Sequence, residues 1–212
     1  MKVCYTALFG PYEELKEPTV VTPGWEYICF TDQDLTSSTW QIRKVTIPEG
    51  KDKQWHARYF KIMEWVDWRY SMWVDASFRI DTDLNDWWQK YFLKPFSVPA
   101  HTTRNCVFEE IESAIGANRG NREQSLAQYD EYRKAGVKRG QGIITSGLLM
   151  RENTPEVIRL CEHWWQEMFG RSVRDQVAFG RIWKDYENLV HRYDYDYTLN
   201  THFRYFKHFN RR

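Results

Sequence analysis

A carboxylate that directly follows an apolar run is the residue best placed for chemistry in this chain. The run Ser71–Val74 ends at Asp75, and upstream of it Arg58 and Lys61 lie three positions apart. Residues three apart share one flank of a helix, so both cations would point the same way. Ligands of open α/β sheets bind beyond the carboxyl ends of the strands. A strand that ends in a carboxylate, with cations nearby, is suited to a metal-bound phosphate, and this pairing indicates an enzyme that uses a nucleotide sugar.

The chemistry expected at Asp75 is the neutralisation of a diphosphate. Mg²⁺ and Mn²⁺ prefer carboxylate oxygens, and a departing nucleoside diphosphate needs its growing charge stabilised. Ser77, two residues on, could complete the metal shell with its hydroxyl. An aspartate that only caps a turn is an equally simple interpretation, but the two upstream cations favour a ligand. The Asp-x-Asp pattern at 81–83 follows no apolar strand, and Asp83 is expected to cap a helix instead.

Two further groups of residues are candidates for the site. Arg174, Asp175 and Gln176 begin a predicted helix, where Asp175 could hold sugar hydroxyls and Gln176 could steady the reacting centre. The spacing also fits a capping box between Ser172 and Asp175, which is the simpler role. In the aromatic tail, a histidine could be a further metal ligand and a lysine could contact phosphate, although scattered surface residues are commoner. These tail residues are His202, Lys207 and His208.

Composition limits the class of protein. A chain of 212 residues can form one domain with a substantial core. The formal charge of +1 argues against a protein that only coats nucleic acid, although local basic clusters leave a nucleic-acid acceptor open as a minority interpretation. Four scattered cysteines lack the spacing of a zinc site. No GxGxxG, P-loop, GxSxG or HExxH motif occurs. Without a leader or an apolar run of bilayer length, a cytoplasmic protein with no membrane span is expected.

Hydrophobic periodicity predicts one α/β domain over residues 1–212. Strands are expected at 2–9, 25–30, 41–47, 71–74, 97–101 and 143–151, and helices at 52–68, 83–92, 105–117, 155–170 and 172–186. The polar stretch 118–139 is predicted to hold a loop and a helix that stops near Gly136. Ser146-Gly147 interrupts a strand at a place where backbone can approach a ligand closely.

Five short segments, taken in order, resemble a glycosyltransferase-like family that includes plant mucilage-glycan proteins and was long catalogued as a domain of unknown function. These segments are Cys4–Tyr12, Cys29–Asp32, Ala57–Lys61, Trp73–Ser77 and Arg174–Gln176. The stretch Arg104–Glu110 and the pair Trp164-Trp165 also fit that pattern. The resemblance spans nearly the whole chain.

The resemblance implies a GT-A fold, in which a mixed, Rossmann-like central sheet is flanked by helices. It implies a nucleotide-sugar donor, expected to be a UDP-sugar, a divalent metal (Mn²⁺ or Mg²⁺), and a glycan or other hydroxyl acceptor. The nucleotide would contact Thr6, Ala7, Phe9, Gly10, Tyr12, Asp32, Arg58, Lys61 and Lys207; the metal would contact Asp75, Ser77 and His202 or His208; and Arg174, Asp175 and Gln176 would lie beside the donor sugar. Because Ser77 stands where this fold usually has an acid, a non-catalytic nucleotide- or carbohydrate-binding domain is the alternative.

Overall fold

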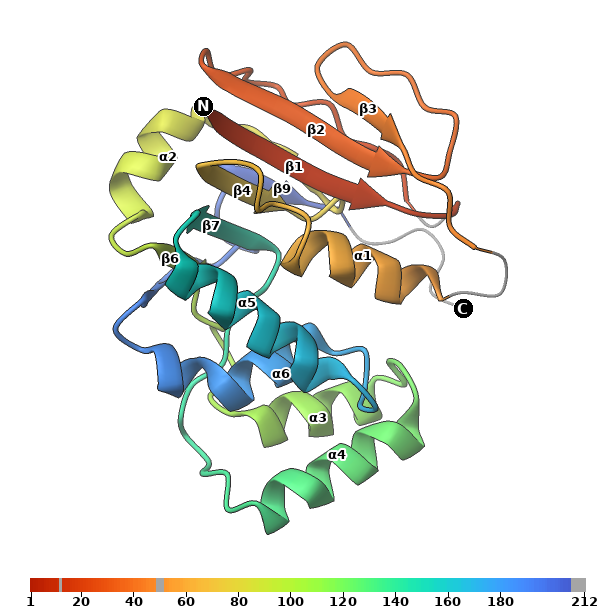
Figure 1. Ribbon diagram of the computed structural model, residues 1–212, viewed down its shortest axis with the longest axis vertical. Helices are drawn as coiled ribbons and strands as arrows, with labels where there is room; N and C mark the ends of the chain where they lie inside the picture. Colours follow the sequence, from red (N-terminus) through yellow and green to blue (C-terminus); the bar gives the residue numbers. More distant parts are fainter. Residues whose placement is uncertain (12, 49–51, 207–212) are drawn as a thin grey trace.

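The structure is a computed structural model that describes residues 1–11, 13–48 and 52–206. In this part of the chain a mixed central sheet has the strand order β3-β2-β1-β4-β7-β6-β8 (Figure 1). Its strands are β1 (Lys2–Leu8), β2 (Trp25–Thr31), β3 (Gln41–Lys44), β4 (Tyr70–Val74), β6 (Phe96–Pro99), β7 (Leu148–Glu152) and β8 (Val190–Tyr193). A small second sheet pairs β5 (Phe78–Ile80) with β9 (Phe203–Tyr205). The helices are α1 (Lys53–Ile62), α2 (Leu84–Tyr91), α3 (Val107–Gly116), α4 (Arg122–Lys134), α5 (Pro155–Met168) and α6 (Asp175–Ile182), and a 3₁₀ turn (Trp183–Tyr186) follows α6.

The strand directions divide the central sheet into two halves. Strands β3, β2, β1 and β4 are parallel, whereas β7 runs antiparallel to both β4 and β6. The chain moves outward from β1 to β2 and β3, and then returns to the other side of β1 to form β4. This reversal makes a switch point at the carboxyl ends of β1 and β4, where ligands of such sheets bind. The mixed α/β sheet that the sequence predicts is therefore confirmed.

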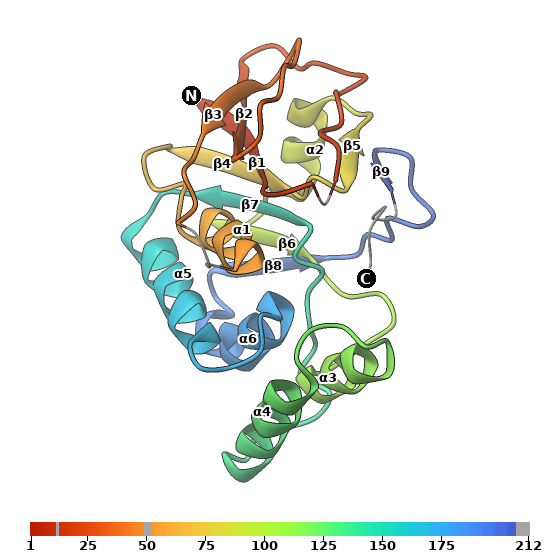
Figure 2. The same cartoon turned by 90° about the vertical axis from the view of Figure 1, so that its right-hand side faces the viewer.

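Both faces of the sheet are buried. On β1, Val3 and Tyr5 belong to the core cluster that includes residues of α1, α5 and α6, whereas Cys4 and Leu8 belong to the cluster with α2, β5 and β9. Figure 2 shows α1, α5 and α6 on one side of the sheet, with α2 and the small sheet on the other. Strands covered on both faces need apolar side chains at successive positions. This explains why the central strands appear in the sequence as nearly continuous apolar runs.

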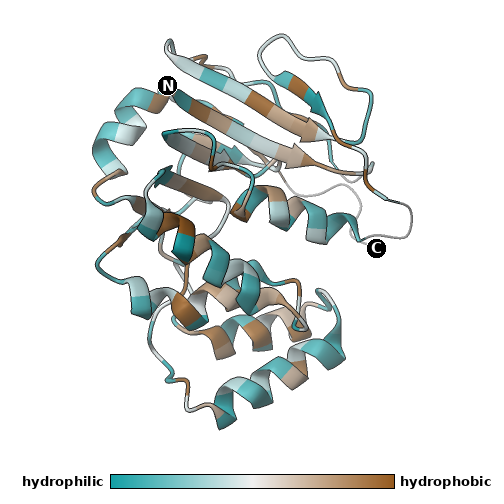
Figure 3. Ribbon diagram, in the orientation of Figure 1, coloured by the Kyte–Doolittle hydropathy of each residue, from teal (hydrophilic) through white to brown (hydrophobic). Residues whose placement is uncertain are grey.

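Helices α3 and α4 form a hairpin that extends away from the sheet (Figure 2). A third cluster, which includes Phe108, Ile111, Tyr132 and Val177, joins this hairpin to α6. The residues of α4 are mostly hydrophilic, and those of α3 are more hydrophobic (Figure 3). The helix expected within 118–139 is therefore present as α4, and Gly136 follows its end with φ of 72°.

Local sequence patterns predicted the ends of some helices and strands correctly and the ends of others incorrectly. Asp83 caps α2 as predicted, because its side chain accepts from the backbone N–H groups of Asn85 and Asp86. The helix expected over 52–68 ends at Ile62, whose carbonyl accepts from the Trp65 indole at 2.7 Å. Strands β5, β8 and β9 were not predicted, because their apolar patterns are short.

Two expectations from composition concern the cysteines and the membrane. All four cysteines are free and buried. Among the helices that the structure describes, none combines the length and apolar character needed to cross a bilayer.

Candidate functional site

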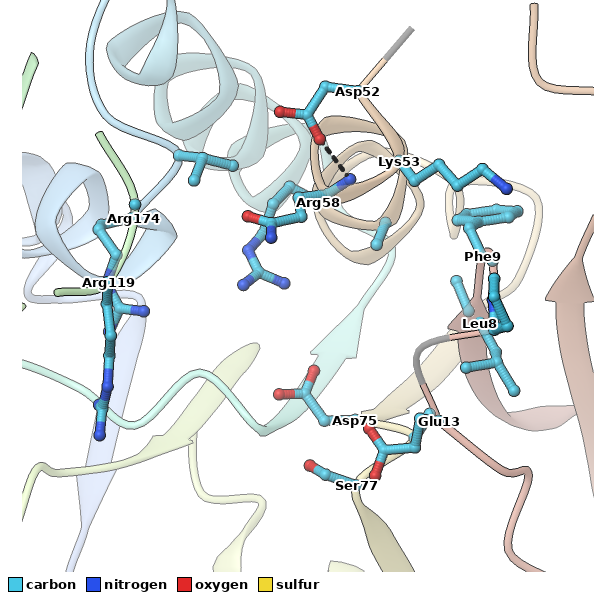
Figure 4. A pocket seen from close by; sticks show the side chains of 18 of the residues that line it. Leu8, Phe9, Glu13, Asp52, Lys53, Arg58, Asp75, Ser77, Arg119 and Arg174 are labelled. Atoms are coloured by element: carbon cyan, nitrogen blue, oxygen red, sulfur yellow. Dashed lines mark hydrogen bonds between the residues drawn. The ribbon is translucent and has the colours of Figure 1, made fainter. Parts of the chain in front are cut away.

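A cavity of about 870 Å³ opens at the switch point between β1 and β4 (Figure 4). Its walls come from five parts of the chain: the end of β1, the first turns of α1, the end of β4 with the segment after it, the α3–α4 turn, and the residues before α6. The lining residues used below are Phe9, Gly10, Glu13, Lys53, Arg58, Asp75, Ser77, Arg119 and Arg174. Segments far apart in sequence therefore meet at this edge of the sheet.

Asp75 is the first residue after β4, and one oxygen of its carboxylate is held by neighbouring side chains. Its Oδ1 accepts from the Trp73 indole at 2.6 Å and lies 3.0 Å from the Lys61 ammonium. Its side chain is 30 % exposed, and no residue in the described part of the chain donates a hydrogen bond to Oδ2. A Cβ at Gly147 would lie 3.6 Å from Oδ2 and only 2.7 Å from the Phe78 ring. The absence of a side chain at Gly147 thus keeps space beside the oxygen of Asp75 that can take a ligand.

Lys61 lies beneath the cavity floor and joins two acids. Its side chain is 1 % exposed, and its Nζ lies 3.0 Å from Asp75 Oδ1 and 2.9 Å from Asp175 Oδ2. The Ser146 hydroxyl donates to the same Asp175 oxygen at 2.8 Å. Because Lys61 does not line the cavity, it can orient Asp75 without touching a ligand.

Asp175 begins α6 and is fully buried among cations. Its Oδ1 lies 3.4 Å from Arg58 Nε, and its Oδ2 pairs with Lys61. Burial alone would raise the pKa of Asp175, but the charges of Arg58, Lys61 and Arg174 outweigh burial and hold this pKa well below its usual range. The predicted capping box with Ser172 is wrong, because α6 begins at Asp175 and the Ser172 hydroxyl instead donates to Gln128 Oε1 at 2.5 Å.

The neighbours of Asp175 point in different directions. Arg174 lines the cavity, and its guanidinium donates to Glu110 and to Gln176 Oε1. The Gln176 amide donates to the Ile144 carbonyl at 2.9 Å. Gln176 is therefore engaged with the backbone and does not line the cavity.

The turn after β1 is fixed by an aspartate. Asp32 Oδ1 accepts from the Gly10 N–H at 2.7 Å, and Oδ2 pairs with the Lys53 ammonium at 2.7 Å. Burial would raise the pKa of Asp32, but these donors lower it overall. Gly10 has φ of +71°, and a Cβ there would lie 3.0 Å from Lys53 Cδ. Asp32 thus shapes the turn that presents Phe9 to the cavity.

Arg151 on β7 is fully buried and holds the end of α1. It donates to the Lys61 carbonyl at 2.8 Å and to the Tyr5 hydroxyl, and its guanidinium lies 4.8 Å from the Trp65 ring. No carboxylate pairs with it among residues 1–11, 13–48 and 52–206. A cation at a helix C-terminus is favourable, because the last carbonyls carry partial negative charge.

The structure brings some of the predicted site residues together and leaves others apart. Those that line the cavity are Ala7, Phe9, Gly10, Arg58, Asp75, Ser77 and Arg174; those that do not are Thr6, Asp32, Lys61, Asp175, Gln176 and His202. Predicted residues Tyr12, Lys207 and His208 lie outside the described residues. His202 is not beside Asp75: its ring packs 5.6 Å from the Trp87 ring of α2, and its carbonyl accepts from the Asp81 N–H.

The lining residues that the sequence did not predict include the charged residues Glu13, Lys53 and Arg119. Figure 4 shows Glu13 near Asp75 and Ser77, and Arg119 on the opposite wall near Arg174. Lys53 lines the cavity from the first turn of α1. For Arg119 a signal existed, because Asn118-Arg119-Gly120 is a turn-prone sequence between two helical patterns.

The oxygen ligands at the centre of the cavity fit a cation that arrives with a phosphate. Within the described ranges no group of three or more His, Cys, Asp or Glu side chains could hold a metal. Asp75, Glu13 and Ser77 nevertheless line the same cavity. Mg²⁺ usually keeps water and is bound by one or two carboxylates together with substrate phosphates. These residues can therefore hold a substrate-bound metal, but they do not form a closed protein cage.

The mixed sheet and the cavity at its switch point are those of a Rossmann-like α/β domain with a ligand site beyond the carboxyl ends of its parallel strands. The sequence profile of the "TOD1/MUCI70, glycosyltransferase-like domain" matches residues 39–208, and the chain belongs to that family. The fold is similar to that of mouse xyloside xylosyltransferase 1 in its apo form, with a TM-score of 0.50, 8% sequence identity, and coverage of 91% of this chain and 84% of that one. Comparison with curated proteins gives no match.

Proposed function

We propose that this domain transfers a sugar from a nucleoside-diphosphate donor, a UDP-sugar, to a hydroxyl group of a glycan acceptor. One observation carries the proposal: Asp75 lies at the switch point with Oδ2 available to a ligand, and Arg58 lines the same cavity. A carboxylate and a guanidinium that share a cavity in this position suit a metal-bound diphosphate.

In this mechanism the donor's diphosphate binds between Asp75 and Arg58. A divalent cation, Mn²⁺ or Mg²⁺, would be held by Asp75 with Ser77, and when bound it would neutralise the leaving diphosphate. Arg58 also balances phosphate charge, and its Nε lies 3.4 Å from Asp175, so the guanidinium is oriented before the donor binds. Preorganised charge of this kind acts where negative charge grows during the reaction.

The nucleoside is assigned to the β1 end of the cavity. Phe9 and Gly10 line that end, and Asp32 fixes their turn through the Gly10 N–H. The transferred sugar then lies toward Arg174, on the far side of Asp75 (Figure 4). Lys61 and Asp175 are positioning residues in this scheme, because neither lines the cavity.

Titration calorimetry with UDP, with and without Mn²⁺, tests the proposal. We expect Asp75→Asn to weaken Mn²⁺-dependent UDP binding by roughly 10- to 100-fold, the range for loss of a charge-assisted contact. The matched control is Asp34→Asn, because the Asp34 side chain is 99% exposed and lies in a surface ion pair. Equal UDP affinity in wild type and Asp75→Asn would refute the assignment.

A non-catalytic domain that binds a nucleotide or a carbohydrate is the second candidate. Ser77 stands two residues after Asp75, where a second acid would strengthen a metal site. Turnover separates the two candidates: we expect release of UDP from at least one UDP-sugar in a screen of donors. UDP binding without hydrolysis or transfer of any donor would favour the binding domain.

The ion pairs of the basic clusters favour a glycan acceptor over a nucleic acid. Arg171 pairs with Glu131 at 2.5 Å, and Arg139 pairs with Glu112 at 2.7 Å. Phosphate binding depends on cations that can exchange counterions for the backbone. Because these arginines at the surface already have carboxylate counterions, their contact with a nucleic-acid backbone would release fewer salt ions.

A further inference from the structure

Arg119, in the turn between α3 and α4, lines the cavity. Within the described residues its guanidinium makes no hydrogen bond or ion pair, and its Nε is buried. A buried N–H without a partner loses its hydration and gains nothing in return. This position therefore calls for an acceptor that a ligand would bring.

The backbone holds Arg119 in place before any ligand binds. Helix α3 ends with the Arg119 N–H donating to the Ala114 carbonyl at 2.8 Å and the Asn118 N–H donating to the Ile115 carbonyl at 3.1 Å. Asn118 between them is left-handed, with φ of 51°. This pattern is a Schellman motif. Because Asn121 then caps α4 through the Gln124 N–H, both ends of the turn are fixed.

The other cations that line the cavity are each engaged with a carboxylate. Lys53 pairs with Asp32, Arg58 with Asp175, and Arg174 with Glu110. Among the residues that the structure describes, no carboxylate pairs with Arg119, so its guanidinium adds a positive charge to the cavity wall. A single guanidinium matches the single charge of a carboxylate and binds both of its oxygens in a fork.

The place of Arg119 in the cavity separates it from the nucleoside end. Figure 4 shows Phe9 on one side, Arg119 and Arg174 on the other, and Asp75 with Arg58 between them. Under the proposed function, the nucleoside and the diphosphate occupy the first two regions. The group that reaches Arg119 is then a sugar.

We propose that Arg119 is a specificity-determining residue that binds the carboxylate of an acidic sugar. This inference rests on the proposed function and names its substrate class. The carboxylate has two possible sources, the transferred sugar of the donor or a uronic acid of the acceptor glycan. Both sources present the same chemistry to the guanidinium.

Binding measurements on Arg119→Gln test this inference in two arms. The first arm compares UDP-glucuronate with UDP-glucose, and the second compares an oligouronide with its carboxyl-reduced, neutral counterpart in the presence of UDP. We expect the variant to lose about 10- to 100-fold in affinity for the acidic member of one pair, with the neutral member unchanged. Arg122→Gln is the matched control, because Arg122 begins α4, is exposed and does not line the cavity.

The outcomes distinguish this inference from the proposed function. UDP binding by wild-type protein tests the proposed function, and a thermal unfolding temperature equal to that of the wild type shows that Arg119→Gln is folded. Loss confined to UDP-glucuronate assigns the contact to the donor, and loss confined to the oligouronide assigns it to the acceptor. Equal loss for UDP and for every ligand would overturn the inference, because Arg119 would then contact the diphosphate. Unchanged affinity for both acidic ligands would overturn it as well.

Discussion

Replacement of Lys61 by methionine should destabilise the protein strongly, although it removes only one charge. The Lys61 ammonium lies 3.0 Å from Asp75 Oδ1 and 2.9 Å from Asp175 Oδ2, and its side chain is 1% exposed. Methionine has a similar length and is apolar, so the main change is electrostatic. Asp175, whose side chain is 3% exposed, would keep its burial and lose its closest cation.

The expected loss follows from the geometry of the two ion pairs. At about 3 Å and an effective dielectric constant of about 20, each pair contributes roughly 5 kcal/mol of attraction. Most of this is offset by desolvation of the charges, and removal of one partner from a buried pair typically costs about 3–5 kcal/mol. We therefore expect Lys61→Met to lower the free energy of unfolding by about 3–5 kcal/mol.

Urea denaturation at pH 7 measures this loss, and a double-mutant cycle isolates the pair. The cycle consists of Lys61→Met, Asp175→Asn and the double variant, with Lys184→Met as the control. Lys184 pairs with Glu187 at 3.2 Å, but both side chains are about half exposed, so the control should lose at most about 1 kcal/mol. The double variant removes both charges of the Lys61–Asp175 pair. Its loss of unfolding free energy should therefore be smaller than the sum of the losses of the two single variants. A Lys61→Met loss no larger than that of Lys184→Met, or strictly additive losses, would refute the reasoning.

Three further predictions concern pH, packing and capping. The pKa of Asp175 is held below its usual 3.8, so its ionised form contributes stability above that value, and the contribution is lost as pH falls toward the lower, folded pKa. The difference in free energy of unfolding between wild type and Asp175→Asn should therefore stay constant from about pH 8 to 5 and shrink below about pH 4. Urea denaturation across this range measures the difference, and an increase of the difference in acid would contradict the prediction. Gly147→Ala places a Cβ 2.7 Å from the Phe78 ring and should cost about 1–3 kcal/mol by thermal unfolding, whereas a neutral result would mean that the ring moves freely. Asp83→Ala removes the α2 cap and should cost about 1 kcal/mol in denaturant, with Asp83→Asn, which retains a capping oxygen, close to wild type.

The parts of the fold that local sequence determines were predictable. The carboxylate at the end of β4 and the cap at Asp83 each follow from a few neighbouring residues, because apolar runs and capping side chains act within one element. Strand β9 could not be found this way, because three residues of mixed polarity form a strand only through pairing with β5.

The candidate site was predictable in part. Arg58 and Asp75 both line the cavity, as their places on α1 and after β4 suggested. The burial of Lys61 against Asp175 was not predictable, because the two residues are 114 positions apart and only tertiary packing joins them. Arg119 was missed for the same reason: the sequence shows a polar turn, and only the fold brings that turn over the ends of β1 and β4.

The hydrogen bonds of Arg151 limit how this molecule can open and close. The Arg151 guanidinium on β7 donates both to the Lys61 carbonyl, near the end of α1, and to the Tyr5 hydroxyl of β1. Any tilt of α1 would therefore break several buried contacts at once. The α3–α4 hairpin is joined to the rest through a smaller apolar cluster. Gating of the cavity should therefore be a swing of that hairpin, which carries Arg119, against a stationary wall formed by the sheet and α1.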